Sequence, residues 1–396
     1  YAGVVEIPYA GLIGPIDIAA KAITLRGRGH GSTQKQTQDG KNVGWLKATG
    51  AGGQDLITLR NTFSGVIEKI RLIGDSAARP KSAILVTQDL VTPPLGTQFF
   101  SKLSDIWIGE FYGLDTDSAK QFVSGIVYGP PGGVNNDTNL IEFIRIANYV
   151  DAAFDFQSAN ASDTQITVAN VQNGAVAIRT FANLTLSTFF AGVMTDVIFE
   201  LKQAGSVFGT DVRSEKCARL MRVAGDVTSL VLQGGGFQAE DGWLPDDGGG
   251  EAHIIDTGVG FTDFNVDLQD WTLQVFAPLT GNLPVIKAFR SNGSIGSLRL
   301  MQTRGIWPEN FDIGEAVAQN LPNRNVIYYP RASSGQDPMP RDEQTLDFDI
   351  PADRIYRAFR RDNLGELNVR AGPLNVQKRL QPIAVAATAT TGTGAT

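Results

Sequence analysis

Acidic, amide and aromatic side chains recur between residues 208 and 274, and their types suit chemistry on sugars. Asp211 and Asp267 are candidates for the two carboxylates with which a glycoside hydrolase protonates a leaving oxygen and activates water. Glu215 is an alternative acid. Aromatic rings offer a large apolar contact area to the face of a sugar ring. The candidates for substrate binding are Trp271, Phe237, Trp243, Arg213, Gln233 and Gln269.

Short apolar or alternating segments, which must position these residues, recur every 22 residues. One series consists of Phe154, Val176, Ile198 and Leu220, and a second consists of Ile144 and Ile166 followed by Leu186, Phe208 and Leu230. Two short strands in every 22 residues are typical of a coil that stacks on its neighbours with parallel strands. The sequence therefore predicts an all-β protein, a right-handed parallel β-helix. A β-sandwich is the alternative, but two-residue Asn-Gly or Asp-Gly hairpin turns are scarce.

The pattern also predicts the boundaries of the repeat. An initial segment or cap is expected at 1–20 and the β-helix at 21–305. Residues 306–351 are richer in Pro, Asn and charge, which is typical of a connector. Residues 352–396 are expected to form a tail segment of different architecture or, as the resemblance described below implies, a C-terminal trimerisation segment. The chain opens without Met, which indicates a fragment or a processed product.

Alternation within a strand predicts which side chains face solvent. If Phe208, Leu230 and Phe264 point inward, Asp211, Gln233 and Asp267 form one outward column on three successive layers. Carboxylates two layers apart would be about 9.6 Å apart, near the upper end of the separation in inverting glycosidases. The same register places Glu215, Phe237 and Trp271 in a parallel column. A slip of one residue would turn Phe237 inward. The alternative is that the acids are solvated surface residues.

Composition limits the ligands. The net charge of −7 disfavours nucleic acid as a partner, and it opposes an acidic glycan unless that glycan meets a local basic patch. Cys217 is the single cysteine and there are two histidines, so no metal site or cofactor is predicted. The alternative is a calcium site at Asp246, Asp247 and Glu251, although loops that contain glycine and aspartate are common. The sequence contains no run of 18 apolar residues, so membrane insertion is not predicted.

Three stretches carry a resemblance to known proteins: VVEIPYAG with ITLRGRGHGST, DLITLRNTFSGVIEKIRLIG, and DVRSEKCARLMRVAGDVTSLVLQGGGF. Over about residues 1–305 the chain resembles the pectate-lyase-like right-handed β-helix superfamily, and within it the tailspike and tail-fibre proteins of bacteriophages.

This resemblance implies a homotrimer that binds, or also depolymerises, a host surface polysaccharide. It further implies other virion tail proteins as partners and a place in the virion tail, extracellular after release and assembled in the bacterial host cytoplasm. A non-catalytic structural virion or adhesin β-helix is one alternative. A secreted polysaccharide lyase is another, although no calcium-site pattern of lyases is recognisable.

Overall fold

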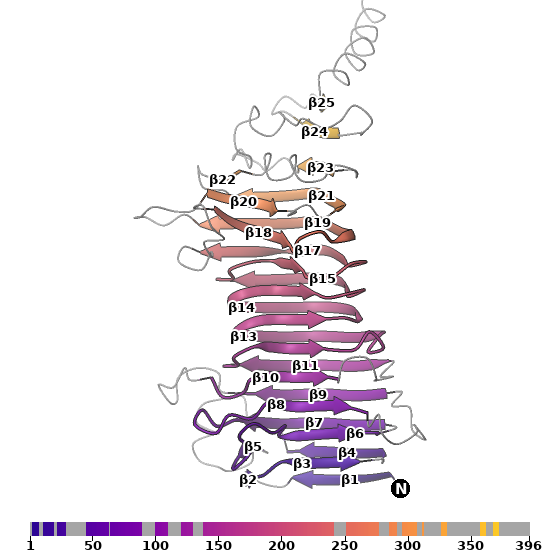
Figure 1. Ribbon diagram of the computed structural model, residues 1–396, viewed down its shortest axis with the longest axis vertical. Helices are drawn as coiled ribbons and strands as arrows, with labels where there is room; N and C mark the ends of the chain where they lie inside the picture. The colour runs from indigo at the N-terminus through magenta and orange to yellow at the C-terminus, as the bar shows by residue number, and fades with distance from the viewer. Residues whose placement is uncertain are drawn as a thin grey trace, which may run out of the picture.

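The described residues form an all-β structure. The computed structural model describes residues 2–7, 11–19, 22–28, 45–62, 64–88, 100–109, 120–129, 138–240, 251–276, 285–290, 295–306, 311–312, 326–330, 357–361 and 367–371. They contain 25 strands in one large sheet and no helix. Figure 1 shows the strands stacked in layers along the longest axis of the molecule.

Each layer is one passage of the chain through up to three strand segments. First segments belong to β1 (Ala2–Ile7), β4 (Ala22–Gly27), β7 (Ser64–Ile73), β9 (Phe100–Ile108), β11 (Asn139–Ala147), β13 (Thr164–Thr180), β14 (Asn183–Leu201), β15 (Ser206–Glu215), β17 (Ser229–Glu240), β19 (Thr262–Phe276), β21 (Ile295–Ile306) and β23 (Val326–Pro330). The long members, β7 to β21, continue into second segments, where β2 (Gly11–Ile13) and β5 (Trp45–Ala48) also pair.

Third segments close each layer. They are β3 (Ile16–Ala19), β6 (Ile57–Arg60), β8 (Ser82–Thr87), β10 (Ser124–Tyr128), β12 (Ala152–Phe156), the ends of β13 and β14, β16 (Met221–Val223), β18 (Glu251–Thr257), β20 (Val285–Arg290) and β22 (Phe311–Asp312). These strands pair in parallel. The described antiparallel pair is β24 (Arg357–Arg361) with β25 (Leu367–Ala371).

The expected all-β, parallel architecture is confirmed. The interval between paired residues varies, however: from β11 to β15 it runs from 20 residues for Leu184 and Thr164 to 25 for Gln165 and Leu140, and it reaches 42 for Gly65 and Ile23. Between β17 and β19 it lengthens to 36, from Leu230 to Val266. β1 and β23 both join the parallel pairing, beyond residues 21–305. The right-handed winding, the trimer and the domain boundaries stay predictions.

One hydrophobic core runs through the layers from Ile18 to Trp271. Apolar side chains at equivalent inward positions stack on each other because the strands are parallel and in register. Side chains of different segments also meet: the Phe189 ring has its centroid 6.4 Å from that of Phe154 and 6.3 Å from that of Phe199, both on third segments. Burying side chains of this size contributes about 1.5–3 kcal/mol each to folding, so the stack is a principal source of stability.

The first and second segments of a long strand meet at a corner residue with a positive φ. In the register these residues occupy one position, the first corner column, and nearly all of them carry side chains. Val168 and Phe143 both have a φ of 54°, a conformation that is rare for β-branched and bulky residues. Backbone pairs on both sides of the corner hold it in place. The column comprises Lys69, Asp105, Phe143, Val168, Thr188, Asp211, Gly234 and Asp270.

A second corner column contains an asparagine pair. Asn148 and Asn173 have φ values of 59° and 56°, and the Asn173 Nδ2 donates to the Asn148 Oδ1 at 2.6 Å. Asparagine tolerates the left-handed region better than most residues. The Lys120 Nζ donates to the Asn173 Oδ1 at 2.7 Å, and burial lowers the pKa of Lys120 to about 8.

Replacing Lys120 with methionine is expected to change how stability depends on pH. The unfolded Lys120 releases its proton near its ordinary pKa of 10.5, whereas the folded side chain releases it at about 8. Between these values the unfolded state binds more protons, so the contribution of Lys120 to stability rises with pH. Urea midpoints at pH 7 and pH 9.5 should therefore increase more for the unmodified protein than for Lys120→Met. Equal pH dependence in the two proteins would contradict the role given to Lys120.

Candidate functional site

The register places Phe208 on the outside. Leu230 pairs with Val207 and with Val266, and all three are buried. The prediction that Phe208, Leu230 and Phe264 share one inward position is wrong, because the intervals are 23 and 36 residues instead of 22 and 34. Phe208 therefore faces solvent, with 46% of its surface exposed.

Asp211, Gln233 and Asp267 occupy three different positions and not one column. Gln233 pairs with Thr210 and with Gln269, while Asp267 pairs with Val231. Asp211 lies in the first corner column. Asp211 and Asp267 are thus two layers apart and also three positions apart along the strand. These offsets of about 9.6 and about 10 Å place their backbones about 14 Å apart.

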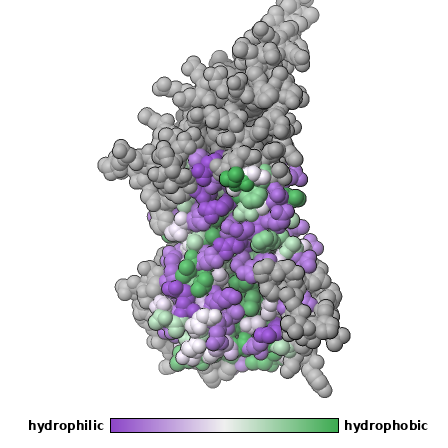
Figure 2. Space-filling model, in the orientation of Figure 1, coloured by the Kyte–Doolittle hydropathy of each residue, from purple (hydrophilic) through white to green (hydrophobic). Residues whose placement is uncertain are grey.

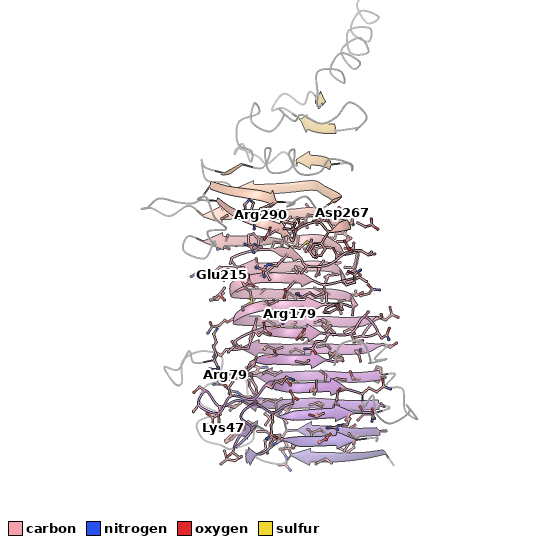
Figure 3. The ribbon with its side chains drawn as sticks, viewed as in Figure 1. Lys47, Arg79, Arg179, Glu215, Asp267 and Arg290 are labelled. Atoms are coloured by element: carbon pink, nitrogen blue, oxygen red, sulfur yellow. The ribbon has the colours of Figure 1, made fainter. Side chains whose placement is uncertain are left out.

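The surroundings of the predicted acids also differ. The Asp211 Oδ1 accepts a hydrogen bond from the Arg213 Nε at 2.8 Å, and both side chains are largely exposed. Asp267 is buried, and its Oδ2 accepts from the Gln269 Nε2 at 3.0 Å. Glu215 ends the second segment of β15, and Figure 3 shows it at the opposite side of the molecule from Asp267. The structure does not bring these three acids together.

Phe237 and Trp271 pack in the core and not on the surface, contrary to the prediction. Each is only 1% exposed. The corner residue between the first and second segments breaks the simple alternation, so residues that follow it change face. Trp271 pairs with Gly235, which pairs in turn with the buried Val212, so the indole occupies an inward position of the register. Trp243, Asp246 and Asp247 lie outside the described residues.

A polar face is formed by the outward positions of the first segments from β13 to β19. Its members share hydroxyl or amide groups, which both donate and accept hydrogen bonds. Phe208 and Val231 lie among them. Figure 2 shows hydrophilic side chains interspersed with small hydrophobic patches on the visible side of the molecule. The polar face comprises Gln165, Thr167, Thr185, Ser187, Thr210, Gln233 and Gln269.

A second feature, which the sequence analysis missed, is a ladder of alternating charges on the third segments. Each member pairs in register with the next, so that acids and arginines alternate over six layers. Figure 3 labels two of its arginines, Arg179 and Arg290. The charge ladder comprises Asp155, Arg179, Glu200, Arg222, Asp256 and Arg290.

Arg179 joins three carboxylates in this ladder. Its Nη2 and Nη1 donate to the two oxygens of Asp151 at 2.7 and 2.8 Å, and its Nε donates to the Glu200 Oε2 at 2.5 Å. The Asp155 Oδ2 is 3.8 Å from the Arg179 Nη1. Burial raises the pKa of Asp155 above its ordinary value. Burial acts on Glu200 as well, but hydrogen bonds from Lys202 and Arg179 outweigh it and lower the Glu200 pKa.

Opposite pKa shifts on two carboxylates are typical of an acid and base pair. Asp155 and Glu200 are only 4% and 7% exposed, however, and Arg179 occupies the layer between them. A polymer in solution has no access to such carboxylates. The charge ladder therefore acts as a structural element that joins neighbouring layers.

The described residues provide little for other chemistry. They contain no group of three or more His, Cys, Asp or Glu side chains that could hold a metal ion. Burial raises the pKa of the Cys217 thiol to about 12, so at neutral pH it is not a thiolate nucleophile. Within the same part of the chain, no helix has the length and apolar character needed to cross a membrane.

Comparisons of the chain with family models, with curated proteins and with solved structures gave no match. The resemblance to bacteriophage tailspike and tail-fibre proteins therefore rests on the sequence motifs alone.

Proposed function

We propose that the chain is a tailspike or tail-fibre receptor-binding protein of a bacteriophage virion tail, which binds a host surface polysaccharide through the polar face. The proposal includes a right-handed parallel β-helix that assembles as a homotrimer. Parallel strands that pair after 20 to 25 residues from β11 to β15 support this architecture. The fold alone does not fix a function, so the proposal depends on the surface.

The exposed ring of Phe208 is the observation that carries the proposal. It lies on the polar face beside Thr185 and Val231 in register, with Thr210 and Gln233 close by. An aromatic ring can stack on the apolar face of a sugar, and neighbouring hydroxyls and amides can bond the hydroxyls of that sugar. The polar face combines these two kinds of contact.

Binding without cleavage is the version that the geometry favours. Asp211 is paired with Arg213, Asp267 is buried, and about 14 Å separates their backbones. The polar face can thus hold a polysaccharide without the close pair of carboxylates that glycoside hydrolysis uses.

Replacing Phe208 with alanine is expected to weaken binding of a host surface polysaccharide about tenfold, equivalent to about 1.4 kcal/mol. The alanine lacks the ring that stacks on the sugar. Isothermal titration calorimetry with purified capsular and lipopolysaccharide glycans measures the change. Phe208→Tyr, which keeps the ring, and Val227→Ala, which shortens an exposed apolar side chain elsewhere, should bind like the unmodified protein. Unchanged binding by Phe208→Ala would exclude the polar face.

The same glycans test cleavage, and the mass of the protein in solution tests assembly. No oligosaccharide is expected to be released on incubation with the protein. Release that both Asp211→Asn and Asp267→Asn abolish would instead establish these residues as a catalytic pair. Light scattering should give the mass of a trimer, and a monomer at micromolar concentration would contradict the tailspike proposal.

A further inference from the structure

Aromatic and arginine side chains share one outward column on the second segments of seven successive layers. Three members are arginines, three are aromatic, and none is acidic. The column lies across the first corner from the polar face. This arginine–aromatic column comprises, in order of layers, Trp45, Arg71, Trp107, Arg145, Asn170, Phe190 and Arg213.

Arg145 is available to an anion. Its guanidinium carbon is 4.6 Å from the centre of the Trp107 ring, and the side chain is exposed. No carboxylate of the described residues pairs with it, whereas Arg179, Arg222 and Arg290 are all paired with acids. A guanidinium stacked on a ring is oriented by that ring and keeps its N–H groups for planar, bidentate acceptors.

The charge around Arg145 is positive although the whole chain carries −7. Arg71, which is buried, lies in the same column, and the exposed side chains of Lys47 and Lys69 lie in nearby positions of neighbouring layers. Three acids lie in the same layers: Asp105 in the first corner column, and Glu68 and Glu142 on the first segments, where Arg26 and Lys102 pair with them. The net charge of the chain opposes an acidic glycan only where no basic patch exists, and this column supplies one.

We propose that the arginine–aromatic column binds an acidic polysaccharide, whose carboxylates pair with Arg145 and Arg213. This inference rests on the proposed function, since it takes the ligand to be a polysaccharide and names its class. Layers are about 4.8 Å apart, so Arg145 and Arg213 are about 14 Å apart along the stack. A glycan running along the stack meets the ring of Phe190 between these two arginines and the ring of Trp107 on the far side of Arg145. Arginine pairs with carboxylates through two parallel hydrogen bonds.

Arg213 differs from Arg145 in that a carboxylate of the protein already pairs with it. Its Nε already bonds the Asp211 carboxylate at 2.8 Å, so a glycan carboxylate competes with Asp211 there. Arg145 has no such competitor. Loss of the Arg145 charge is therefore expected to weaken binding more than loss of the Arg213 charge.

The test uses three acidic polymers, alginate, hyaluronate and polysialic acid, with the methyl ester of each as its uncharged counterpart. Titration of the full chain should show binding of at least one acid form, at least tenfold tighter than its ester and weakened by added salt. Arg145→Gln should reduce that affinity about tenfold and Arg213→Gln by less. Lys81→Gln, which removes a positive charge from an exposed side chain outside the column, should have no effect.

The outcomes separate this inference from the proposed function. Binding of a neutral host glycan that depends on Phe208, without binding of any acidic polymer, would overturn the inference and leave the proposed function standing. Acid and ester bound equally would overturn it as well. Tight binding of single-stranded DNA that depends on Arg145, with no acidic glycan bound, would assign the column to nucleic acid instead. Binding that depends on Arg145 supports the inference even if Phe208→Ala has no effect.

Discussion

Replacing Phe189 with alanine is expected to lower the free energy of unfolding by about 4 kcal/mol. The ring is buried, and the rings of Phe154 and Phe199, both on third segments, have centroids 6.4 and 6.3 Å from its own. Removing it leaves a cavity that flanking layers cannot fill, because their backbones are held by parallel pairing on both sides. Urea unfolding followed by circular dichroism measures the change as a lower midpoint with an unchanged slope.

Phe208→Ala is the matched control for this experiment. It makes the same substitution in the next layer but on the outside, where the ring is largely solvent-exposed. Its effect on unfolding should stay below about 0.5 kcal/mol. If both variants lost equal stability, the assignment of inward and outward faces in β14 and β15 would be incorrect.

Replacing Arg179 with methionine is expected to cost about 3 kcal/mol of stability at neutral pH. The methionine keeps much of the side-chain length but leaves Asp151, Asp155 and Glu200 without their shared cation. Two of these carboxylates are buried, so water cannot replace the lost hydrogen bonds. The deficit should shrink as the pH is lowered, because protonation removes the uncompensated negative charges.

Arg213→Met provides the comparison for the charge ladder. It removes an arginine whose ion pair with Asp211 is exposed to solvent, and such pairs contribute little to stability. Urea midpoints of the two variants at pH 7 and pH 4 measure the stability that each substitution removes at each pH. A similar small loss for both arginines would show that the ladder is a solvated surface feature and not a structural one.

The class of fold was predictable from local patterns. Runs such as AAFDF and DVIFEL are too short to fold alone, and their recurrence requires stacking on neighbours. The register was not predictable from a fixed interval. Val207 and Leu230 are 23 residues apart, so an assumed interval of 22 shifts the faces by one residue and reverses them. Phe208 was placed inside for this reason.

The corner residues explain the other failures. Strict alternation predicts that Trp271 and Gln269 share a face, but Asp270 between them has a φ of 48°. Sequence offers little warning of such a corner, since Val168 and Phe143 hold equivalent positions in other layers. Glycine or asparagine at every corner would have marked the column.

The charge ladder, in contrast, left a readable signal. A single charged residue follows an apolar one in FDF, IRT, FEL and MRV of four successive layers, and its sign alternates from one layer to the next. Comparing charges across layers, and not along one strand, would have found it. The arginine–aromatic column has the same kind of signature in Trp107, Arg145, Phe190 and Arg213.

The left-handed corners have an evolutionary consequence. Eight positions in the first corner column adopt the same backbone conformation with residues as different as lysine, phenylalanine, valine and glycine. Pairing with adjacent layers sets that conformation, so the residue is free to change. Selection can therefore rewrite the rim between the polar face and the arginine–aromatic column without redesigning the fold. The surface beside the corner can thus change one layer at a time while the core stays the same.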